Sequence, residues 1–574
     1  MRTFLYTAAA LSAVLPPALA AADDCRCFPG DACWPTEETW SALNASVGGN
    51  LHKTVPIGSV CHDPQYDEAA CEAVKAAWLD PAIHIDSSHS VQSALFANAS
   101  CDPLAPREAP CVIGTYVQYA VAVESAEDVS KTVKFANENN IRLVIRNTAH
   151  DYLGKSTGAG AIAIWTKNLK SVEKVTWKDS TYQGDAMKLG AGVSGAEVAV
   201  FGHQHGILTP SGNCPTVGPV GGFVQGGGHG PLGSKYGMLA DNALEFEVVD
   251  GAGNLLTANR EQNSDLYWAL RGGGPGTWGV VTSMTAVAYP DIPITFGTIM
   301  FASAGLSEDQ FYGAVASFYD VLPSLVDAGC VAVFLWTPDA FVLSELICPD
   351  LSEDEVNKLI EPFITKLGDI QYQKTIKTYE GYLDFQTEAL DMMTKHQANF
   401  IMGGSWLMPR SVMTDTNGSK QFLEAAKQIT LSGAFVQQLA FNFEKKAKNT
   451  IDNAVLPAWR DTLVHAVVAV PYNPTGSIEE NLAAYVAVND EKLAKLKALA
   501  PASGAYMNEA VPFTADWKTD FYGANYERLA GIKDRYDPEH LFYAFTGVGS
   551  DYWVEQPDKR LCKASASARV KDEL

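Results

Sequence analysis

The chain has little positive charge and no long hydrophobic run beyond its first residues. Its 574 residues include 42 Lys and Arg against 66 Asp and Glu, which gives a formal net charge of -24. Nucleic acids and anionic membranes bind basic surfaces, so the composition predicts neither a nucleic-acid partner nor adsorption to a membrane. Because no run of about eighteen apolar residues follows the N-terminus, no membrane span is predicted either.

Both ends of the chain carry targeting signals. Arg2, an apolar stretch and Ala18-Leu19-Ala20 are typical of a signal peptide over residues 1–20. The alternative, a buried N-terminal helix, would be broken by Pro16-Pro17. Lys571-Asp572-Glu573-Leu574 is the tetrapeptide that an ER-retrieval receptor binds at a C-terminus, with a chance charged tail as the alternative. Together they predict a protein of the ER lumen, and three sequons predict N-glycans at Asn44, Asn98 and Asn417.

Eleven cysteines in an oxidising compartment leave one without a partner. Seven lie in the N-terminal region, Cys562 lies near the other end, and Cys330 and Cys348 flank a predicted hairpin. Cys214 stands more than a hundred residues from its nearest neighbours on either side. Setting it aside leaves ten that can pair, so Cys214 is predicted to be the leftover thiol, occupied by another group.

The order of helix and strand signals predicts an α+β protein with two main parts. Ser125-Ala-Glu-Asp128 opens a helix, and strands follow at 141–145 and 161–165. Residues 245–256 are predicted to form a hairpin. After about residue 290 come amphipathic helices with capping boxes at Ser307 and Ser352, and long hairpin-like stretches between them. This later part is predicted to be an antiparallel sheet backed by helices.

Two glycine-rich stretches match the dinucleotide pattern G-x-G-x-x-G, at 228–233 and 274–279. A Rossmann loop must follow a strand and open a helix. The second match follows a predicted helix and precedes a strand, and the first is followed by the polar Ser-Lys-Tyr-Gly, so neither is a Rossmann turn. Tight turns would explain any one such loop. Three of them, including the loop around Gly158, favour an extended ligand with phosphate groups.

Several short motifs resemble one flavoprotein family. They are Arg146-Asn-Thr-Ala-His150-Asp-Tyr-Leu-Gly154, Cys214-Pro-Thr-Val-Gly218, Gly226-Gly-Gly228, Lys235-Tyr-Gly, Asp241-Asn242, Tyr522-Gly-Ala-Asn525-Tyr-Glu-Arg-Leu529 and Tyr536-Asp-Pro538. In this order they resemble the berberine-bridge-enzyme-like branch of the vanillyl-alcohol-oxidase flavoproteins, in its fungal form. The resemblance covers roughly residues 110–290 and 510–555, whereas the middle of the chain is similar only in its general type and carries none of the motifs.

The resemblance implies a two-subdomain FAD-binding domain with an inserted antiparallel-sheet substrate domain. The predicted boundaries are a signal peptide (1–20), a Cys-rich extension (21–111), the FAD-binding domain (112–290), the substrate domain (291–510), a C-terminal return to the FAD domain (511–560) and a tail with the retrieval signal (561–574).

The resemblance also implies that FAD is bound covalently, through His150 to the 8α-methyl group and through Cys214 to C6 of the flavin. The alternatives are a loop histidine bonded to backbone and a buried free thiol. Thr148-Ala149 replace two glycines that commonly precede the histidine, so the backbone there is less free to approach the pyrophosphate. No metal is predicted. The remaining predicted cofactor-binding residues are Arg146, Asn147, Thr148, Asp151, Gly218, Gly221, Gly227, Gly228 and Asn525.

The family's chemistry implies hydride transfer from a small-molecule substrate to FAD and reoxidation by dioxygen to hydrogen peroxide. The substrate would be an alcohol, a sugar or a secondary metabolite. Tyr522 is the predicted catalytic base, with a packed aromatic as the alternative. Val217 lies where a small side chain leaves room for dioxygen, which favours an oxidase over a dehydrogenase. Cys25-Arg-Cys27 prompts a further alternative, an ER thiol oxidase, and a glycoprotein without catalytic activity is another.

Overall fold

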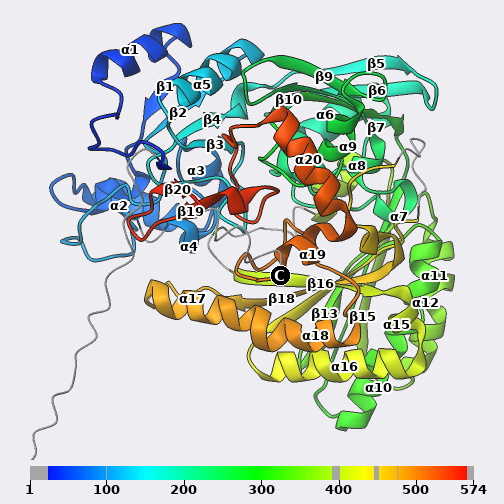
Figure 1. The fold of residues 1–574 in the computed structure, drawn as a ribbon. Helices are drawn as coiled ribbons and strands as arrows, with labels where there is room; N and C mark the ends of the chain where they lie inside the picture. Colours follow the sequence, from blue (N-terminus) through cyan, green and yellow to red (C-terminus); the bar gives the residue numbers. More distant parts are fainter. Residues whose placement is uncertain are drawn as a thin grey trace, which may run out of the picture.

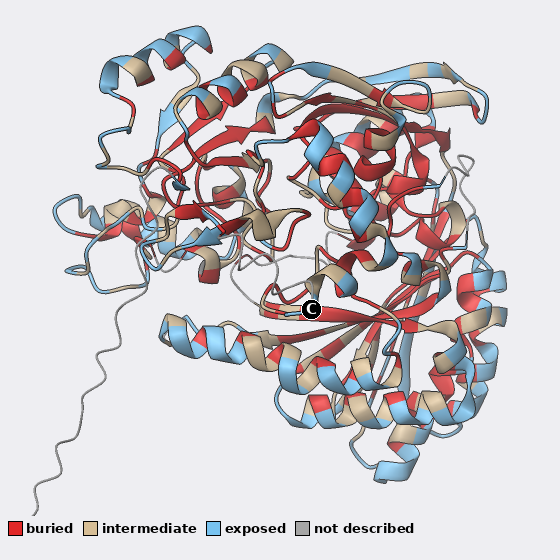
Figure 2. Cartoon of the chain, viewed as in Figure 1, coloured by how far each residue is buried: buried red, intermediate tan, exposed pale blue. Residues whose placement is uncertain are grey.

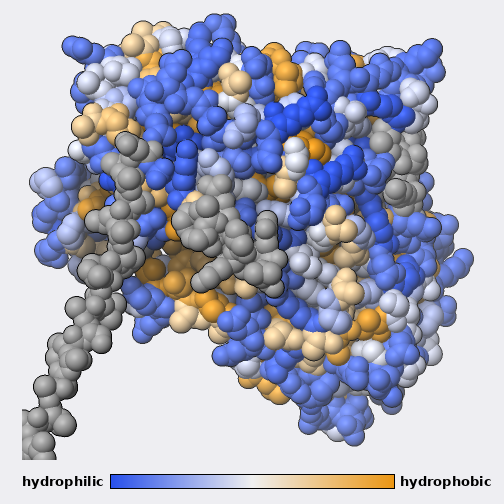
Figure 3. Space-filling model, in the orientation of Figure 1, coloured by the Kyte–Doolittle hydropathy of each residue, from blue (hydrophilic) through white to orange (hydrophobic). Residues whose placement is uncertain are grey.

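The computed structural model describes residues 24–97, 100–390, 398, 401–444, 452–474 and 476–564. The predicted signal peptide, the retrieval tetrapeptide and the sequon at Asn98 lie outside these residues. Among the described residues, no helix combines the length and the hydrophobicity that crossing a membrane requires. The face drawn in Figure 3 is mostly hydrophilic, with apolar side chains gathered in smaller areas.

A small sheet of four strands carries the first part of the predicted FAD-binding domain. Its order is β1-β2-β4-β3, and β2, β4 and β3 run parallel. Buried residues fill both faces of β2 and β4, as a sheet covered on two sides requires. β1 comes from the Cys-rich extension and pairs antiparallel with β2, a contribution that the sequence did not indicate. The strands are β1 (Leu51–Lys53), β2 (Tyr119–Ala122), β3 (Leu143–Arg146) and β4 (Ile162–Trp165).

Helix α5 (Ala126–Glu138) covers this sheet and begins where the sequence predicts. The Ser125 hydroxyl accepts a hydrogen bond from the Asp128 backbone N–H, which satisfies one of the helix's free donors. Val129, Val133 and Ala136 form its buried face. The extension adds four further helices, α1 (Glu37–Ser46), α2 (Glu68–Ala77), α3 (Pro81–Ile85) and α4 (Ala94–Ala97).

A second, five-stranded antiparallel sheet has the order β5-β6-β10-β8-β9. The predicted hairpin is the pair β8 and β9. Helix α9 (Ser264–Leu270) precedes β10, so the second glycine-rich loop runs from helix to strand, as predicted. After the first loop comes only the single-turn helix α7 (Gly233–Tyr236). The remaining elements are β5 (Val172–Lys178), β6 (Gln183–Gly190), β8 (Ala243–Val249), β9 (Leu255–Asn259), β10 (Val280–Val287) and α6 (Gly195–His205).

The largest sheet has seven antiparallel strands in the order β15-β12-β14-β13-β17-β18-β16. Its helices lie on the face away from the FAD-binding part, and they are buried toward the sheet and exposed outward (Figures 1 and 2). α10 (Glu308–Tyr319) and α12 (Glu353–Leu367) both start with the predicted capping boxes. The other elements are β12 (Ile294–Ala302), β13 (Val331–Trp336), β14 (Ala340–Pro349), β15 (Tyr372–Tyr379), β16 (Ile401–Pro409), β17 (Phe435–Ala440), β18 (Thr462–Pro471), α16 (Thr416–Leu431), α17 (Ile478–Ala487) and α18 (Ala494–Leu499).

After the seven-stranded sheet the chain returns to the FAD-binding part. Helices α19 (Trp517–Tyr522) and α20 (Tyr526–Tyr536) and the hairpin of β19 (Trp553–Glu555) and β20 (Leu561–Lys563) form this return. Lys533 on α20 is buried, and its ammonium group donates to Asp537 at 2.5 Å and to the carbonyl oxygens of Thr277 and Phe542 at 2.7 Å each. A buried ion pair with these added hydrogen bonds offsets its desolvation and anchors the returning segment.

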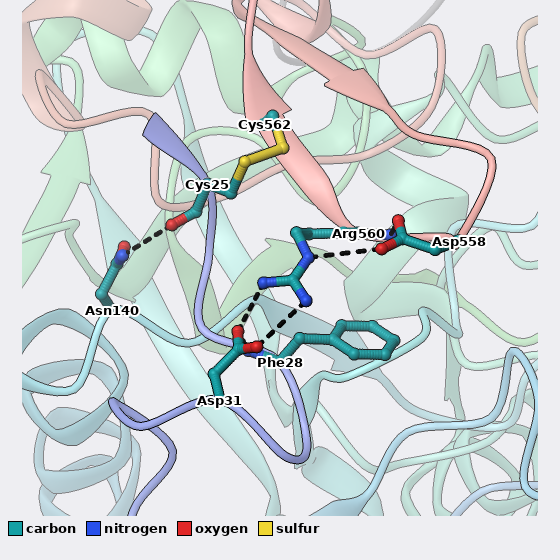
Figure 4. Close-up of a disulfide and its surroundings, with 7 residues drawn as sticks. All are labelled: Cys25, Phe28, Asp31, Asn140, Asp558, Arg560 and Cys562. Carbon is teal, nitrogen blue, oxygen red and sulfur yellow. Dashed lines mark hydrogen bonds and ion pairs between the residues drawn. A yellow bond between two sulfur atoms is a disulfide. The ribbon is translucent and has the colours of Figure 1, made fainter. Parts of the chain in front are cut away.

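Five disulfides form, and Cys214 is the free cysteine among the described residues, which confirms the prediction from the cysteine count. The bond between Cys25 and Cys562 joins two segments 537 residues apart. Beside it, Arg560 donates to both carboxylate oxygens of Asp31, at 2.5 and 3.1 Å (Figure 4). The other pairs are Cys27–Cys33, Cys61–Cys71, Cys101–Cys111 and Cys330–Cys348.

Removing the disulfide that joins the chain's two ends is expected to cost more stability than removing a local one. The variant with Cys25→Ala and Cys562→Ala loses a closed loop with a sequence separation of 537, which corresponds to about 6 kcal/mol in the chain-entropy description. The matched variant, Cys27→Ala with Cys33→Ala, opens a six-residue separation and should lose only about 2 kcal/mol. Thermal unfolding at one scan rate measures both, and an equal loss in the two variants would contradict the expectation.

Candidate active site

A cavity of about 640 Å³ lies between the glycine-rich loops and the inner face of the seven-stranded sheet. Its size falls in the range of cofactor and small-molecule sites. One wall comes from the segment around His150 and the segment around Cys214. The opposite wall comes from β13, β14, β16, β17 and β18, and Tyr506, Asn508 and Glu509 complete the lining.

His150 and Cys214 lie together on the wall of this cavity. His150 Nε2 is 2.7 Å from the Thr216 hydroxyl oxygen, and the Cys214 sulfur is 3.3 Å from the same oxygen. Two residues that are 64 positions apart are therefore brought to one hydroxyl group. Thr216 is the midpoint of the Cys214–Gly218 motif, and nothing in the sequence pattern indicated a role for its hydroxyl group.

The Arg146 side chain anchors the loop that leads to His150. It is fully buried, and its Nη2 donates to the carbonyl oxygens of His84 at 3.0 Å and Ser87 at 2.7 Å. Burial lowers the pKa of Arg146 to about 9. Gln92 adds a further bond from its Nε2 to the Thr148 carbonyl oxygen at 2.9 Å. The Cys-rich extension is thus part of the site's foundation.

The remaining predicted residues of this loop also line the cavity. The Asp151 carboxylate accepts from the backbone N–H of Leu153 at 3.0 Å and of Ser156 at 2.7 Å, which holds the turn after His150. Asn147 donates to the Ala191 carbonyl oxygen at 2.9 Å. Ala149 has a φ of +58°, in the left-handed region where glycine is favoured. Ala149 stands where glycine is common in the family, and its backbone conformation is therefore strained.

The predicted glycines divide into two groups. Gly218 and Gly221 line the cavity, and a Cβ atom on Gly221 would meet no atom within 4 Å, so this surface is open to a bound group. Gly227 and Gly228 are not among the lining residues. Their φ values are +117° and +78°, and a Cβ atom would clash with Met238 and with Phe223. Their glycines serve backbone conformation and packing.

Three other predicted residues have different placements. Val217 lines the cavity. Tyr522 does not: it is fully buried, its hydroxyl donates to the Thr546 carbonyl oxygen at 2.9 Å, and burial raises its pKa. Asn525 donates to the carbonyl oxygens of Ala454 and Val455, at 3.1 and 3.3 Å, and is also absent from the lining. The structure does not bring these two residues to the cavity.

The cavity fits an anionic group with a flat ring. Lys155 and Arg146 both line it, and the Lys155 Nζ and the Arg146 Nε and Nη1 are buried without a hydrogen-bond partner. Burial lowers the pKa of Lys155 to about 8. Buried donors of this kind require a partner, and a diphosphate supplies acceptor oxygens. The open surface at Gly221 leaves room for a ring at close range.

A cluster that the sequence analysis missed lies at the other end of the lining. His229 Nε2 is 3.0 Å from Glu509 Oε1, and His465 Nε2 is 3.7 Å from Glu509 Oε2. Burial lowers the pKa of His465 to about 3, so this ring is neutral. The Tyr506 ring packs edge-on against His229, 5.1 Å away. His229 lies within the glycine-rich motif at 228–233, and this position is the feature of the sequence that could have indicated its role.

This cluster can transfer a proton. Glu509 orients the His229 ring through Nε2, and His229 Nδ1 is buried without a partner. A carboxylate-oriented imidazole is an arrangement that accepts a proton from a hydroxyl group. The ligand atoms of His229, His465 and Glu509 lie within 4.8 Å of one another, so they could also hold a metal ion. The hydrogen bond between His229 and Glu509 favours proton transfer.

Comparison with known proteins identifies the family of this chain. Residues 117–259 match the family of FAD binding domains, and residues 505–549 match the family described as berberine and berberine like. FAD-linked oxidoreductase ZEB1 of Gibberella zeae is 42% identical over 94% of this chain and 95% of its own length. The chain belongs to the berberine-bridge-enzyme-like FAD-linked oxidoreductases of the vanillyl-alcohol-oxidase family. It is an FAD-dependent enzyme, and the fold predicted from the resemblance is confirmed.

A second relative by sequence and a solved structure are similar over nearly the whole chain. The VAO-type flavoprotein oxidase VAO615 of Thermothelomyces thermophilus is 38% identical over 94% of this chain and 95% of its own length. The crystal structure of the VAO-type flavoprotein MtVAO615 from Myceliophthora thermophila C1 superimposes with a TM-score of 0.90 at 37% identity. It covers 94% of this chain and 100% of its own.

Replacing Ala149 by glycine is expected to stabilise the protein. Glycine adopts positive φ without the contact between Cβ and the carbonyl oxygen, a relief of about 1 kcal/mol that exceeds the added entropy of the unfolded chain. Thermal unfolding measures the change. The matched control is Ala163→Gly in β4, a buried strand position where the same exchange should destabilise by about 1 kcal/mol. A lower midpoint for Ala149→Gly would show that the side chain itself is needed.

Proposed function

We propose that this enzyme is an oxidase that binds FAD through two covalent bonds, at His150 and at Cys214, and oxidises a small-molecule alcohol. The proposal rests on one observation above all. The unpaired cysteine of a chain with five disulfides shares the Thr216 hydroxyl with His150 on the cavity wall. A histidine and a thiol held at one point are suited to anchoring two positions on the same ring.

Oxidase activity is favoured over dehydrogenase activity by Val217. This side chain lines the cavity beside the Cys214 segment, where a small residue leaves space for dioxygen. A relative that is 38% identical over 94% of this chain is named an oxidase, which supports the same choice. A dehydrogenase that uses another electron acceptor is the second candidate.

His229 is the proposed proton acceptor, and this replaces the sequence's choice of Tyr522. FAD, when bound, supplies the hydride acceptor and passes the two electrons to dioxygen, which leaves as hydrogen peroxide. The chain's task is to hold the substrate hydroxyl and remove its proton. The free Nδ1 of His229 accepts this proton, while Glu509 at Nε2 stabilises the charge that develops. The neutral His465 ring leaves Glu509 available for this role.

The thiol-oxidase alternative is disfavoured by the disulfides. Cys25 and Cys27 are bonded to different partners, Cys562 and Cys33, rather than to each other. Both are buried, at 6% and 3% exposure, so a substrate thiol has no access to them. The five disulfides themselves fit the proposed location in the ER lumen, since they persist in oxidising compartments. Asn417, exposed at the start of α16, is the most accessible of the described sequons.

Acid precipitation is expected to leave the yellow colour in the protein pellet, because covalent bonds survive unfolding. The single variants His150→Ala and Cys214→Ala should each keep colour through the other bond. The double variant should release it into the supernatant. The absorption spectrum of pellet and supernatant measures the result. Colour in the supernatant from the unchanged protein would exclude both bonds.

Replacing His229 by glutamine is expected to slow substrate oxidation by about 10²- to 10⁴-fold, the usual contribution of a general base. The rate of flavin reduction without oxygen measures this step, using an alcohol found in a peroxide-coupled screen. Glu509→Gln should lower the same rate and shift its pH profile. The matched control is His203→Gln on the exposed face of α6, which should leave the rate unchanged. A rate unaffected by His229→Gln would remove the residue from the mechanism.

A further inference from the structure

The sheet wall of the cavity is aliphatic except at a few positions. Three strands, β13, β17 and β18, contribute Val333, Leu335, Leu439 and Val467 to it. The pairing register aligns Glu345 on β14, Val333 on β13, Leu439 on β17 and His465 on β18 in one cross-strand row. Residues of such a row point to the same face of the sheet. Glu345 therefore faces the cavity from the far end of the row that begins at His465.

Glu345 is a buried carboxyl group without a cation. It is 6% exposed, and Asn213 Nδ2 donates to its Oε2 at 2.5 Å. Among the described residues, its Oε1 has no donor and no Lys or Arg pairs with it. Burial raises the pKa of Glu345 to about 7, and the Asn213 hydrogen bond acts in the opposite direction. A carboxyl group in an aliphatic wall is costly unless something binds it.

We infer that Glu345 is a specificity residue that binds a hydrogen-bond donor on the far end of an uncharged, mainly apolar substrate with at least two hydroxyl groups. The inference rests on the proposed function, because it takes the hydroxyl at His229 as the one oxidised. Glu345 and His465 are three strand spacings apart, or roughly 14 Å between backbones. The donor therefore lies several bonds from the reacting carbon.

The chemistry of the wall narrows the substrate class. Of the described residues that line the cavity, the cations Arg146 and Lys155 lie beside His150, and the sheet contributes none. A carboxylate or phosphate directed at Glu345 would be repelled. A sugar carries hydroxyl groups on all sides, and most of them would lose their hydrogen bonds against Val333, Leu335 and Leu439. An apolar skeleton with separated hydroxyl groups can bind both His229 and Glu345 and pack against the aliphatic wall between them.

The test uses four ligands built on 2-naphthalenemethanol, which differ only in the group at position 6. The groups are hydroxymethyl (a donor), methoxymethyl (an acceptor only), methyl and carboxylate. At a pH well above 7, where the Glu345 carboxyl is ionised, isothermal titration of the holoenzyme should show the hydroxymethyl ligand binding about ten- to hundredfold more tightly than the methyl and methoxymethyl ligands. The carboxylate should bind most weakly. Binding is measured under anaerobic conditions on the dithionite-reduced holoenzyme, which cannot accept a hydride, so this result stands whether or not the protein produces peroxide.

Variants separate recognition from a structural role. Glu345→Leu should bring the hydroxymethyl, methoxymethyl and methyl ligands to similar affinities, whereas Glu345→Gln, which keeps an acceptor oxygen, should retain part of the preference. The neighbouring cavity residue gives a matched control, since Ser344→Ala should keep the full preference. Four ligands that bind alike to the unchanged holoenzyme, or that do not bind, would overturn the inference. So would a Glu345→Leu variant that weakens all four equally. Absence of peroxide with every alcohol tested would count against the oxidase proposal alone.

Discussion

The Arg146 guanidinium carries a charge into the interior, and the arrangement of the cofactor loop follows from the need to hold it there. A buried charge is costly unless hydrogen bonds replace its water. Backbone carbonyl oxygens of the Cys-rich extension, at His84 and Ser87, supply part of that replacement. Residues 84–92 are thus required beside the end of β3, although they precede it in the chain by more than fifty positions. The local disulfides and the bond from Cys25 to Cys562 hold this extension on the body.

A second consequence is the division of labour across the cavity. The loops beside His150 and Cys214 supply glycines, cations and the two proposed attachment residues, all suited to one rigid cofactor. The opposite wall is a seven-stranded sheet whose backbone bonds are satisfied within the sheet, so its side chains can change without loss of the fold. The cofactor wall is therefore the part that the sequence motifs describe. The sheet wall, where we propose that the substrate is selected, carries no motif.

Local features could be predicted from the sequence because their causes are local. The capping boxes at Ser307 and Ser352, the β8–β9 hairpin and the unpaired Cys214 all follow from spacing or from counting. Contacts between distant segments could not be predicted in this way. Tyr522 belongs to a motif, yet its hydroxyl is satisfied by the Thr546 carbonyl oxygen away from the cavity. His229 and Glu509 are 280 positions apart, and no spacing rule joins them.

The buried polar groups of this protein distinguish its framework from its site. Lys533 and Asp537 are as deeply buried as any pair in the chain, and every strong donor and acceptor between them is used. At the cavity the same kinds of groups are left incomplete. Arg146, Lys155 and His229 each keep a buried nitrogen without a partner, and the Glu345 carboxylate accepts from Asn213 alone among the described residues. Burial costs a polar group a similar desolvation free energy at the Lys533–Asp537 pair and at the cavity. The incomplete hydrogen bonding at the cavity therefore requires partners that the chain does not supply. Anionic oxygens suit Arg146 and Lys155, and hydroxyl groups suit His229 and Glu345. The proposed cofactor and the proposed substrate follow one another along the cavity in this order.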